Sequence, residues 1–364
     1  MVDKEKINVR QFGLFVVIYS IGTPILIVPA GLTSIAKQDA WIAATIGIGI
    51  GLLLVSLYQA VGKLFPEKSL VETTELLLGK WIGNAVSFTF VFFCLIAASE
   101  LFYYVGNFMT TQIMSITPIQ SINIIFAVVV VMGIKLGIET LARSAELMFP
   151  IFIVLFLILV VFVSPQIEIE RIQPVLETKL KDLTWATMYF TSNFSLTQIA
   201  LLMIFPSFVD RPEAASKAFY KGMIIGGIVL VVIIALCILV LGADTTARQT
   251  FPSYALAKKI NVGQFLQRIE IVMAIMWFIT IYYRLCIYFH GAAMGLAHVL
   301  KLKDYKFLVL PLGMIVVSLS LIVHPNTLHM EEYTQHAWLP YVMTYGLFLP
   351  LLLLVVHAIR KKRQ

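Results

Sequence analysis

Apolar segments of about twenty residues follow one another along most of the chain. A helix of roughly 20 apolar residues is long enough to cross the hydrocarbon core of a bilayer. Hydrophobic residues make up 60% of the chain and charged residues only 13%, whereas soluble domains carry about 25% charged residues. The segments lack the short alternating pattern of a transmembrane barrel. We therefore predict an all-α integral membrane protein in contact with the lipid bilayer.

The apolar pattern predicts ten membrane-spanning helices. Their expected ranges are 11–36, 40–62, 84–114, 121–138, 143–164, 184–208, 217–241, 267–298, 307–324 and 338–358. An even number of spans places both termini on the same side of the membrane. Most of the 27 lysines and arginines fall on that side, including Lys4 and the tail 360–363. The smaller basic group, with Arg268, falls on the other side. The positive-inside rule then predicts cytoplasmic termini, and the tail is interpreted as a contact with an anionic leaflet, not with nucleic acid.

The first span is interrupted at its own centre. Gly22 lowers helix propensity there, and Pro24 removes one backbone donor. Thr23 precedes a proline and is therefore biased away from the helical region. In hydrocarbon an unpaired backbone group costs several kcal/mol, so a break is tolerated only where protein, water or a ligand takes up the freed groups. The break predicts a binding site at mid-membrane depth.

The second half of the chain repeats this arrangement with inverted topology. Five predicted spans precede Pro165 and five follow it, and span six carries a polar run at 191–198. Interruptions at matching positions in two inverted halves are typical of a transporter-type site. The alternative is an intact span six, whose hydroxyls bond back to their own helix. We predict one membrane domain over 1–364, with repeats at about 11–164 and 184–358 and with helices one and six broken.

The sequence Gly22-Thr23-Pro24-Ile25-Leu26-Ile27-Val28-Pro29 resembles the first helix of the B subunits of spore germinant receptors. These subunits belong to the amino acid–polyamine–organocation transporter superfamily, and the similarity extends over essentially the whole chain. The resemblance implies a germinant-sensing role in the inner spore membrane together with receptor A and C subunits. It also implies a small-molecule germinant whose identity differs between members.

Helix one offers backbone groups to an amino acid ligand. The N–H groups of Ile25 and Leu26 begin the outer half-helix at its positive end, where a carboxylate is favoured. The carbonyls of residues 19–21 end the inner half-helix and suit an ammonium group. The alternative is that Thr23 caps its own helix and the proline only kinks it. The ligand contacts predicted on this helix are Ser20, Ile21, Gly22, Thr23, Ile25 and Leu26.

Other predicted ligand contacts come from spans three, six and eight. Asn193 and Ser195 offer donors and acceptors opposite helix one, although such residues also hold helices together. Phe194 is expected to wall the ligand's side chain. Tyr103 and its neighbour Tyr104 differ in facing by about 100°, so at least one faces the pocket. The full set from these spans is Tyr103, Asn193, Phe194, Ser195 and Thr280.

Two ionisable residues lie at mid-depth, Glu100 in span three and Arg284 in span eight. Each costs about 2.5–3.5 kcal/mol on insertion scales if it is unpaired. We predict that they face each other or share water, with Thr280 on the same helix face as Arg284. The alternatives are proton coupling by Glu100 and recognition of a ligand carboxylate by Arg284.

The sequence contains no motif of catalysis, phosphate binding or metal ligation. Its three cysteines are scattered through apolar spans. We therefore expect neither an enzyme nor a bound cofactor. The leading hypothesis is a receptor subunit that senses a small molecule, and the alternative is a proton-coupled transporter of amino acids or amines. Outside the spans, short helices are predicted near 66–72, capped by Ser69, and at 252–257.

Overall fold

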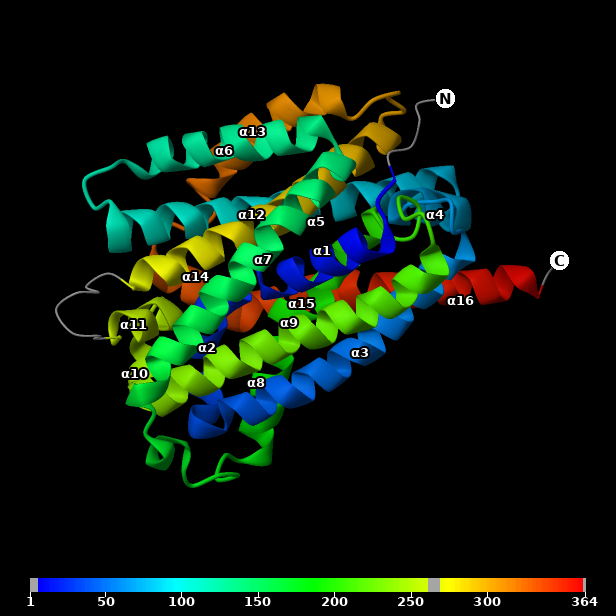
Figure 1. Cartoon of the computed structure of the whole chain (residues 1–364). Helices are drawn as coiled ribbons and strands as arrows, with labels where there is room; N and C mark the ends of the chain where they lie inside the picture. The colour runs from blue at the N-terminus through cyan, green and yellow to red at the C-terminus, as the bar shows by residue number, and fades with distance from the viewer. Residues whose placement is uncertain (1–5, 261–268, 363–364) are drawn as a thin grey trace.

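The computed structural model describes residues 6–260 and 269–362, and their secondary structure is almost entirely helical (Figure 1). The predicted start of span eight at 267 lies outside the described residues, as do Lys4, Arg268 and Arg363. Seven helical segments of the described part are long and apolar enough to cross a membrane. Two shorter apolar helices, Val9–Ile21 and Lys306–Ser320, accompany them. The all-α membrane class is confirmed, while the number of ten spans stays a prediction.

The first half of the chain contributes helices α1 to α7. Their bounds are α1 (Val9–Ile21), α2 (Pro24–Ala36), α3 (Ala40–Leu64), α4 (Leu70–Leu78), α5 (Lys80–Phe108), α6 (Ile119–Leu136) and α7 (Ile138–Val163). The second half contains α8 (Leu180–Phe194), the 3-10 helix η5 (Leu196–Met203), α9 (Pro212–Leu241), α10 (Ala243–Arg248), α11 (Pro252–Lys258), α12 (Glu270–Val299), α13 (Lys306–Ser320), α14 (Thr327–Glu332), α15 (Trp338–Met343) and α16 (Leu349–Lys361).

Both predicted interruptions are present. Helix α1 ends at Ile21 and α2 begins at Pro24, and Gly22 between them has φ 21°, a conformation that favours glycine. Helix α8 ends at Phe194, within the predicted polar run, and the chain continues as a 3-10 helix with different hydrogen bonding. The hypothesis of an intact span six is therefore wrong, and helices one and six are both broken.

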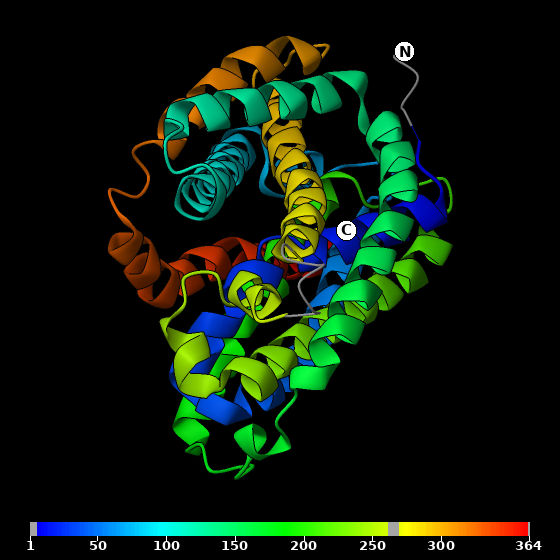
Figure 2. The ribbon, with the colours of Figure 1, turned by 60° about the vertical axis from the view of Figure 1, so that its left-hand side comes forward.

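The broken first helix lies in the interior of the bundle. Helix α1 packs along α9 and also contacts α12 and α7. Close approach to α9 depends on two glycines, because a Cβ atom at Gly222 or Gly226 would lie 2.7 Å from the Cβ of Val16 or Ser20, respectively. Helix α12 packs against α5 on its other side, and α6 and α13 pair outside them (Figure 2). The two breaks are thereby held at the centre, facing α12.

The start of α1 and the end of α16 lie at the same end of the molecule as α4, while α10 and α11 lie at the opposite end (Figure 1). Near the first end, the Arg360 guanidinium of α16 donates to the Leu76 carbonyl of α4 at 3.2 Å. Such an arrangement agrees with an even number of crossings. Which membrane side this end occupies remains a prediction from the positive-inside rule.

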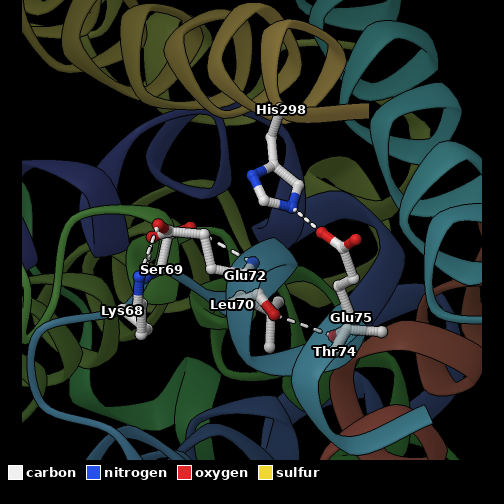
Figure 3. A network of polar contacts seen from close by, with 7 residues as sticks. All are labelled: Lys68, Ser69, Leu70, Glu72, Thr74, Glu75 and His298. Atoms are coloured by element: carbon white, nitrogen blue, oxygen red, sulfur yellow. Dashed lines mark hydrogen bonds and ion pairs between the residues drawn. The ribbon is translucent and has the colours of Figure 1, made fainter. Parts of the chain in front are cut away.

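The two predicted short helices are confirmed as α4 and α11. Ser69 caps α4, because its hydroxyl accepts from the Glu72 N–H while the Glu72 carboxylate accepts from the Ser69 N–H. Figure 3 shows this cap and a second contact, in which Glu75 of α4 meets His298 at the end of α12. The Glu75 Oε2 and His298 Nε2 atoms are 2.5 Å apart. Helix α4 is therefore fastened to the end of α12.

We expect the His298→Ala substitution to loosen α4. A partly exposed side-chain hydrogen bond or ion pair contributes about 1 kcal/mol or less, so the free energy of unfolding should fall by roughly that amount. Limited trypsin digestion at Lys68, just before α4, should also become faster. The control is His336→Ala, at an exposed position far along the chain. Equal melting and digestion of the two variants would contradict a fastening role for His298.

Candidate functional site

Arg284 of α12 bridges the two helix breaks. Its Nη1 donates to the Tyr19 carbonyl at the end of α1, with a distance of 3.1 Å. Its Nη2 donates to the Asn193 carbonyl at the end of α8 (2.8 Å) and to the Thr197 hydroxyl of η5 (3.1 Å). The guanidinium carbon also lies 5.0 Å from the centre of the Tyr19 ring, which is a cation–π distance. One buried cation thus holds both unwound segments.

Other side chains take up further carbonyls at the breaks. The Thr280 hydroxyl donates to the Gly22 carbonyl at 3.2 Å, and the Tyr19 hydroxyl donates to the Thr197 carbonyl at 2.8 Å. The Tyr58 hydroxyl of α3 reaches the Leu196 carbonyl at 3.2 Å. Of the carbonyls predicted to hold a ligand ammonium, that of Tyr19 is already occupied by Arg284. The protein therefore satisfies much of the broken backbone without a ligand.

Pro29 creates a further free carbonyl inside α2. Proline has no N–H to donate to the carbonyl four residues earlier, which is that of Ile25. The Ser253 hydroxyl of α11 donates to the Ile25 carbonyl instead, at 2.5 Å. Helix α11 is thereby attached to the outer half of the broken helix. Helix α11, the short helix predicted at 252–257, thus packs on α2 and α12.

The start of α2 keeps an unused hydroxyl. The Thr23 side chain makes no capping hydrogen bond, and its buried Oγ1 has no partner among the described residues. The alternative in which Thr23 caps its own helix is therefore wrong in this structure. Of the two N–H groups predicted to face a carboxylate, that of Leu26 already donates to the Thr23 carbonyl at 3.1 Å.

A small cavity of about 30 Å³ lies beside the first break. The residues that matter for its chemistry come from five segments and are Thr23, Glu100, Tyr104, Asn193, Arg284 and Trp338. Five of its lining residues hold a buried polar atom without a hydrogen-bond partner among the described residues: Thr23 Oγ1, Glu100 Oε1, Arg284 Nε, Tyr288 Oη and Trp338 Nε1. Buried polar groups are normally paired, so this cluster indicates a place for a polar ligand or water.

Glu100 and Arg284 line this cavity together but form no ion pair within 4.0 Å in the described part of the chain. The prediction of a direct pair is wrong, whereas the two residues do share one space. Tyr333 lies within hydrogen-bonding reach of the Glu100 carboxyl. Both ionisable residues line the same cavity, whose volume in this structure suits roughly one or two water molecules.

Several predicted ligand contacts point elsewhere. Tyr103 packs on His324, with ring centres 5.0 Å apart, and it is Tyr104 that lines the cavity. Phe194 packs on Phe190, with ring centres 5.0 Å apart, and not on the cavity. On a helix, one residue of displacement turns a side chain by about 100°, and residue spacing alone does not fix which face is inward.

The remaining predicted residues divide between the edge of the cavity and the packing around it. Gly22 and Thr280 are joined by a hydrogen bond next to Arg284. Ser195 faces α3, where its hydroxyl lies 2.4 Å from the position that a Cβ atom on Gly51 would take. Ser20 donates to the Val16 carbonyl and accepts from the Gln198 amide at 2.8 Å. Ile21, Ile25 and Leu26 are fully buried and do not line the cavity.

A second cavity of about 70 Å³ lies next to the first, toward α10 and α14. The two share three wall residues: Ile27, Tyr104 and Thr334. The Tyr104 hydroxyl and the Thr334 hydroxyl are 3.2 Å apart and form a hydrogen bond between α5 and the segment after α14. This hydrogen bond and the Ile27 side chain therefore lie at the boundary of both cavities. Sequence reasoning missed Thr334 and Trp338, because nothing in the pattern of the last span marks them.

Comparison with known proteins agrees with this arrangement. Residues 6–328 match the family model described as "Spore germination protein". The chain is 29% identical over 366 residues to spore germination protein KB of Bacillus subtilis (strain 168), covering 100% of this chain and 97% of that protein. Among solved structures, the nucleobase-cation-symport-1 family transporter Mhp1 is similar with a TM-score of 0.69 and 12% identity, over 94% of this chain and 78% of the transporter. A Na⁺-coupled sialic acid symporter has a TM-score of 0.67 and 9% identity, over 94% and 80%.

Proposed function

The chain belongs to the spore germination protein family, and from this premise we propose that it is the germinant-sensing membrane subunit of a spore germination receptor. Its fold is similar to that of solved transporters, and its own first and sixth helices are broken. The observation that carries the proposal is the small cavity beside the first break, where five lining residues each hold a buried polar atom without a partner among the described residues. A membrane protein that only needed to be stable would gain by filling such a space with apolar side chains.

We propose that the ligand is a small molecule with a carboxylate and an ammonium group, as in an amino acid. Arg284 Nε and the Thr23 hydroxyl supply donors for the carboxylate on one side of the cavity. The Glu100 carboxylate supplies an acceptor for the ammonium group on the other side. In this pose the ammonium group binds Glu100 and not the helix-one carbonyls that the sequence predicted. Arg284 and Thr280 already bind the Tyr19 and Gly22 carbonyls.

Sensing requires that ligand binding shifts the protein between two conformations, which it does only through different affinities for the two. The Tyr104–Thr334 hydrogen bond, at the boundary of both cavities, is a contact that a closing site makes and an open site breaks. We propose that receptor A and C subunits in the inner spore membrane respond to this closure. In the same proposal both termini lie on the cytoplasmic side, as the positive-inside rule predicts.

The second candidate is a proton-coupled transporter of amino acids or amines. Glu100 favours it, since a buried carboxyl without an ion pair in the described residues can take up and release a proton. The two candidates share one fold, so the fold does not separate them.

The test combines binding with transport. The purified protein is reconstituted in proteoliposomes and assayed with each of the twenty standard L-amino acids in radiolabelled form, with and without a proton gradient. The receptor proposal expects saturable binding of at least one amino acid without accumulation above equilibrium. Accumulation that scales with the proton gradient would show the transporter instead, and no binding by any amino acid would reject an amino acid germinant.

A further inference from the structure

We propose that Arg284 is a built-in cation of the ligand site, so that the site binds its ligand without a co-bound metal ion and selects ligands by their carboxylate. The identity of the ligand in this inference rests on the proposed function, whereas the role of Arg284 rests on its contacts in the structure. The guanidinium lies where two helices end, and the carbonyl end of each helix carries a partial negative charge of about half an electron.

The contacts of Arg284 are those that a bound cation would make. Backbone carbonyls at the ends of α1 and α8 and a hydroxyl of η5 accept its hydrogen bonds, at 2.8–3.1 Å. The side chain is 4% exposed and has no carboxylate within 4.0 Å in the described residues. Its charge is therefore balanced mainly by backbone dipoles, as a metal ion at the same place would be.

The surrounding chain is shaped around this side chain. A Cβ atom at Gly22 would lie 2.4 Å from Arg284 Cδ and 3.2 Å from Arg284 Cβ, so the break passes directly against the aliphatic part of the arginine. The Tyr19 and Tyr288 rings lie 5.0 Å and 6.0 Å from the guanidinium carbon. Two aromatic faces and two helix ends thus enclose a planar cation, which suits arginine better than a spherical ion.

The occupied carbonyls limit the class of ligand. A primary amine without a carboxylate finds the Tyr19 and Asn193 carbonyls already bound to Arg284, and it leaves Arg284 Nε and the Thr23 hydroxyl unpaired. A site with buried donors rejects an analogue that leaves them unpaired. The site therefore takes carboxylates, and the amine made by removing the carboxylate of a bound amino acid is excluded.

The first test uses ions and ligand analogues with the full-length protein. Binding of the panel of radiolabelled amino acids is measured in sodium, potassium and choline chloride, and each bound amino acid is competed with its decarboxylated amine. We expect equal affinity in the three salts, and an amine affinity weaker by about 100-fold, since the amine leaves the buried charged donor without its partner. A strict sodium requirement, or an amine that competes as well as the amino acid, would overturn the inference.

The second test needs no ligand and separates this inference from the proposed function. Thermal unfolding of Arg284→Ala is measured with and without low-millimolar guanidinium chloride. Free guanidinium should fill the vacated position and raise the melting temperature of this variant, while it should leave wild type and the control Arg143→Ala unaffected. Arg143 is exposed and pairs with Glu139.

If Arg284→Ala is too unstable to purify, Arg284→Lys takes its place, because lysine keeps the positive charge but lacks the planar guanidinium group. We expect this variant to melt below wild type and to recover with guanidinium less than Arg284→Ala does. Absence of guanidinium stabilisation in both variants would refute the built-in cation even if amino acids bind. Guanidinium stabilisation without any amino acid binding would keep the cation and reject the proposed ligand.

Discussion

Replacing Gly22 by alanine should abolish ligand binding and destabilise the protein. The added Cβ would lie 2.4 Å from Arg284 Cδ and 2.9 Å from the Tyr19 carbonyl oxygen, and one of these neighbours is rigid backbone. Gly22 also has φ 21°, which alanine adopts only with strain. Overpacking costs about 1–3 kcal/mol and the backbone strain about 1–2 kcal/mol more, so we expect a loss of roughly 3 kcal/mol. Arg284 must move, which opens its contacts to both helix breaks.

The control is Gly49→Ala in α3, where an added Cβ meets nothing within 4 Å. Alanine is the better helix former by about 1 kcal/mol, so this variant should melt at or above the wild-type temperature. Thermal unfolding in detergent and binding of the amino acid panel are measured on both variants. If Gly22→Ala binds and melts like Gly49→Ala, the break is not organised around Arg284.

Glu100→Gln should separate stability from binding. The substitution keeps the shape of the side chain and removes a buried carboxyl that has no ion pair within the described residues, so the melting temperature should stay or rise. Ligand binding should weaken by about 10- to 100-fold, because a hydrogen bond between a charged group and its partner contributes some 1.5–3 kcal/mol. Equilibrium binding and thermal unfolding of the same purified sample measure the two effects.

Glu332→Gln provides the comparison, since Glu332 is exposed and does not line the cavity. It should bind and melt like wild type. Unchanged affinity in Glu100→Gln would remove Glu100 from the ligand pose. Lower stability together with weaker binding would indicate a structural role instead.

The fold was predictable where local chemistry decides it. Gly22 and Pro24 disfavour a helix wherever they stand, so the first break follows from the sequence. The Ser69 cap of α4 follows in the same way from a local motif. The inverted second break at Phe194 followed from its position relative to the first, although no glycine or proline marks it.

The site was less predictable, because its contacts join distant parts of the chain. Arg284 reaches the Tyr19 carbonyl across 265 positions of sequence. Ser253 reaches the carbonyl freed by Pro29, a pairing that no spacing rule provides. The direction in which a helical side chain points was the second difficulty, since Tyr104 and not Tyr103 lines the cavity. A pattern shows that a residue is polar and buried, but not which distant partner satisfies it.

The most direct test of the central claim is ligand binding to two threonine variants, one just before α2 and one within it, measured side by side. Thr23 and Thr33 are both buried threonines of the outer half of helix one, but Thr33 donates to the Pro29 carbonyl of its own helix, whereas Thr23 Oγ1 faces the cavity without a partner among the described residues. We predict that Thr23→Val weakens equilibrium binding of the bound amino acid by about tenfold, the value of one hydrogen bond of roughly 1.4 kcal/mol, and that Thr33→Val leaves it within about twofold. Equal affinity of Thr23→Val and Thr33→Val would contradict a ligand site beside the first helix break.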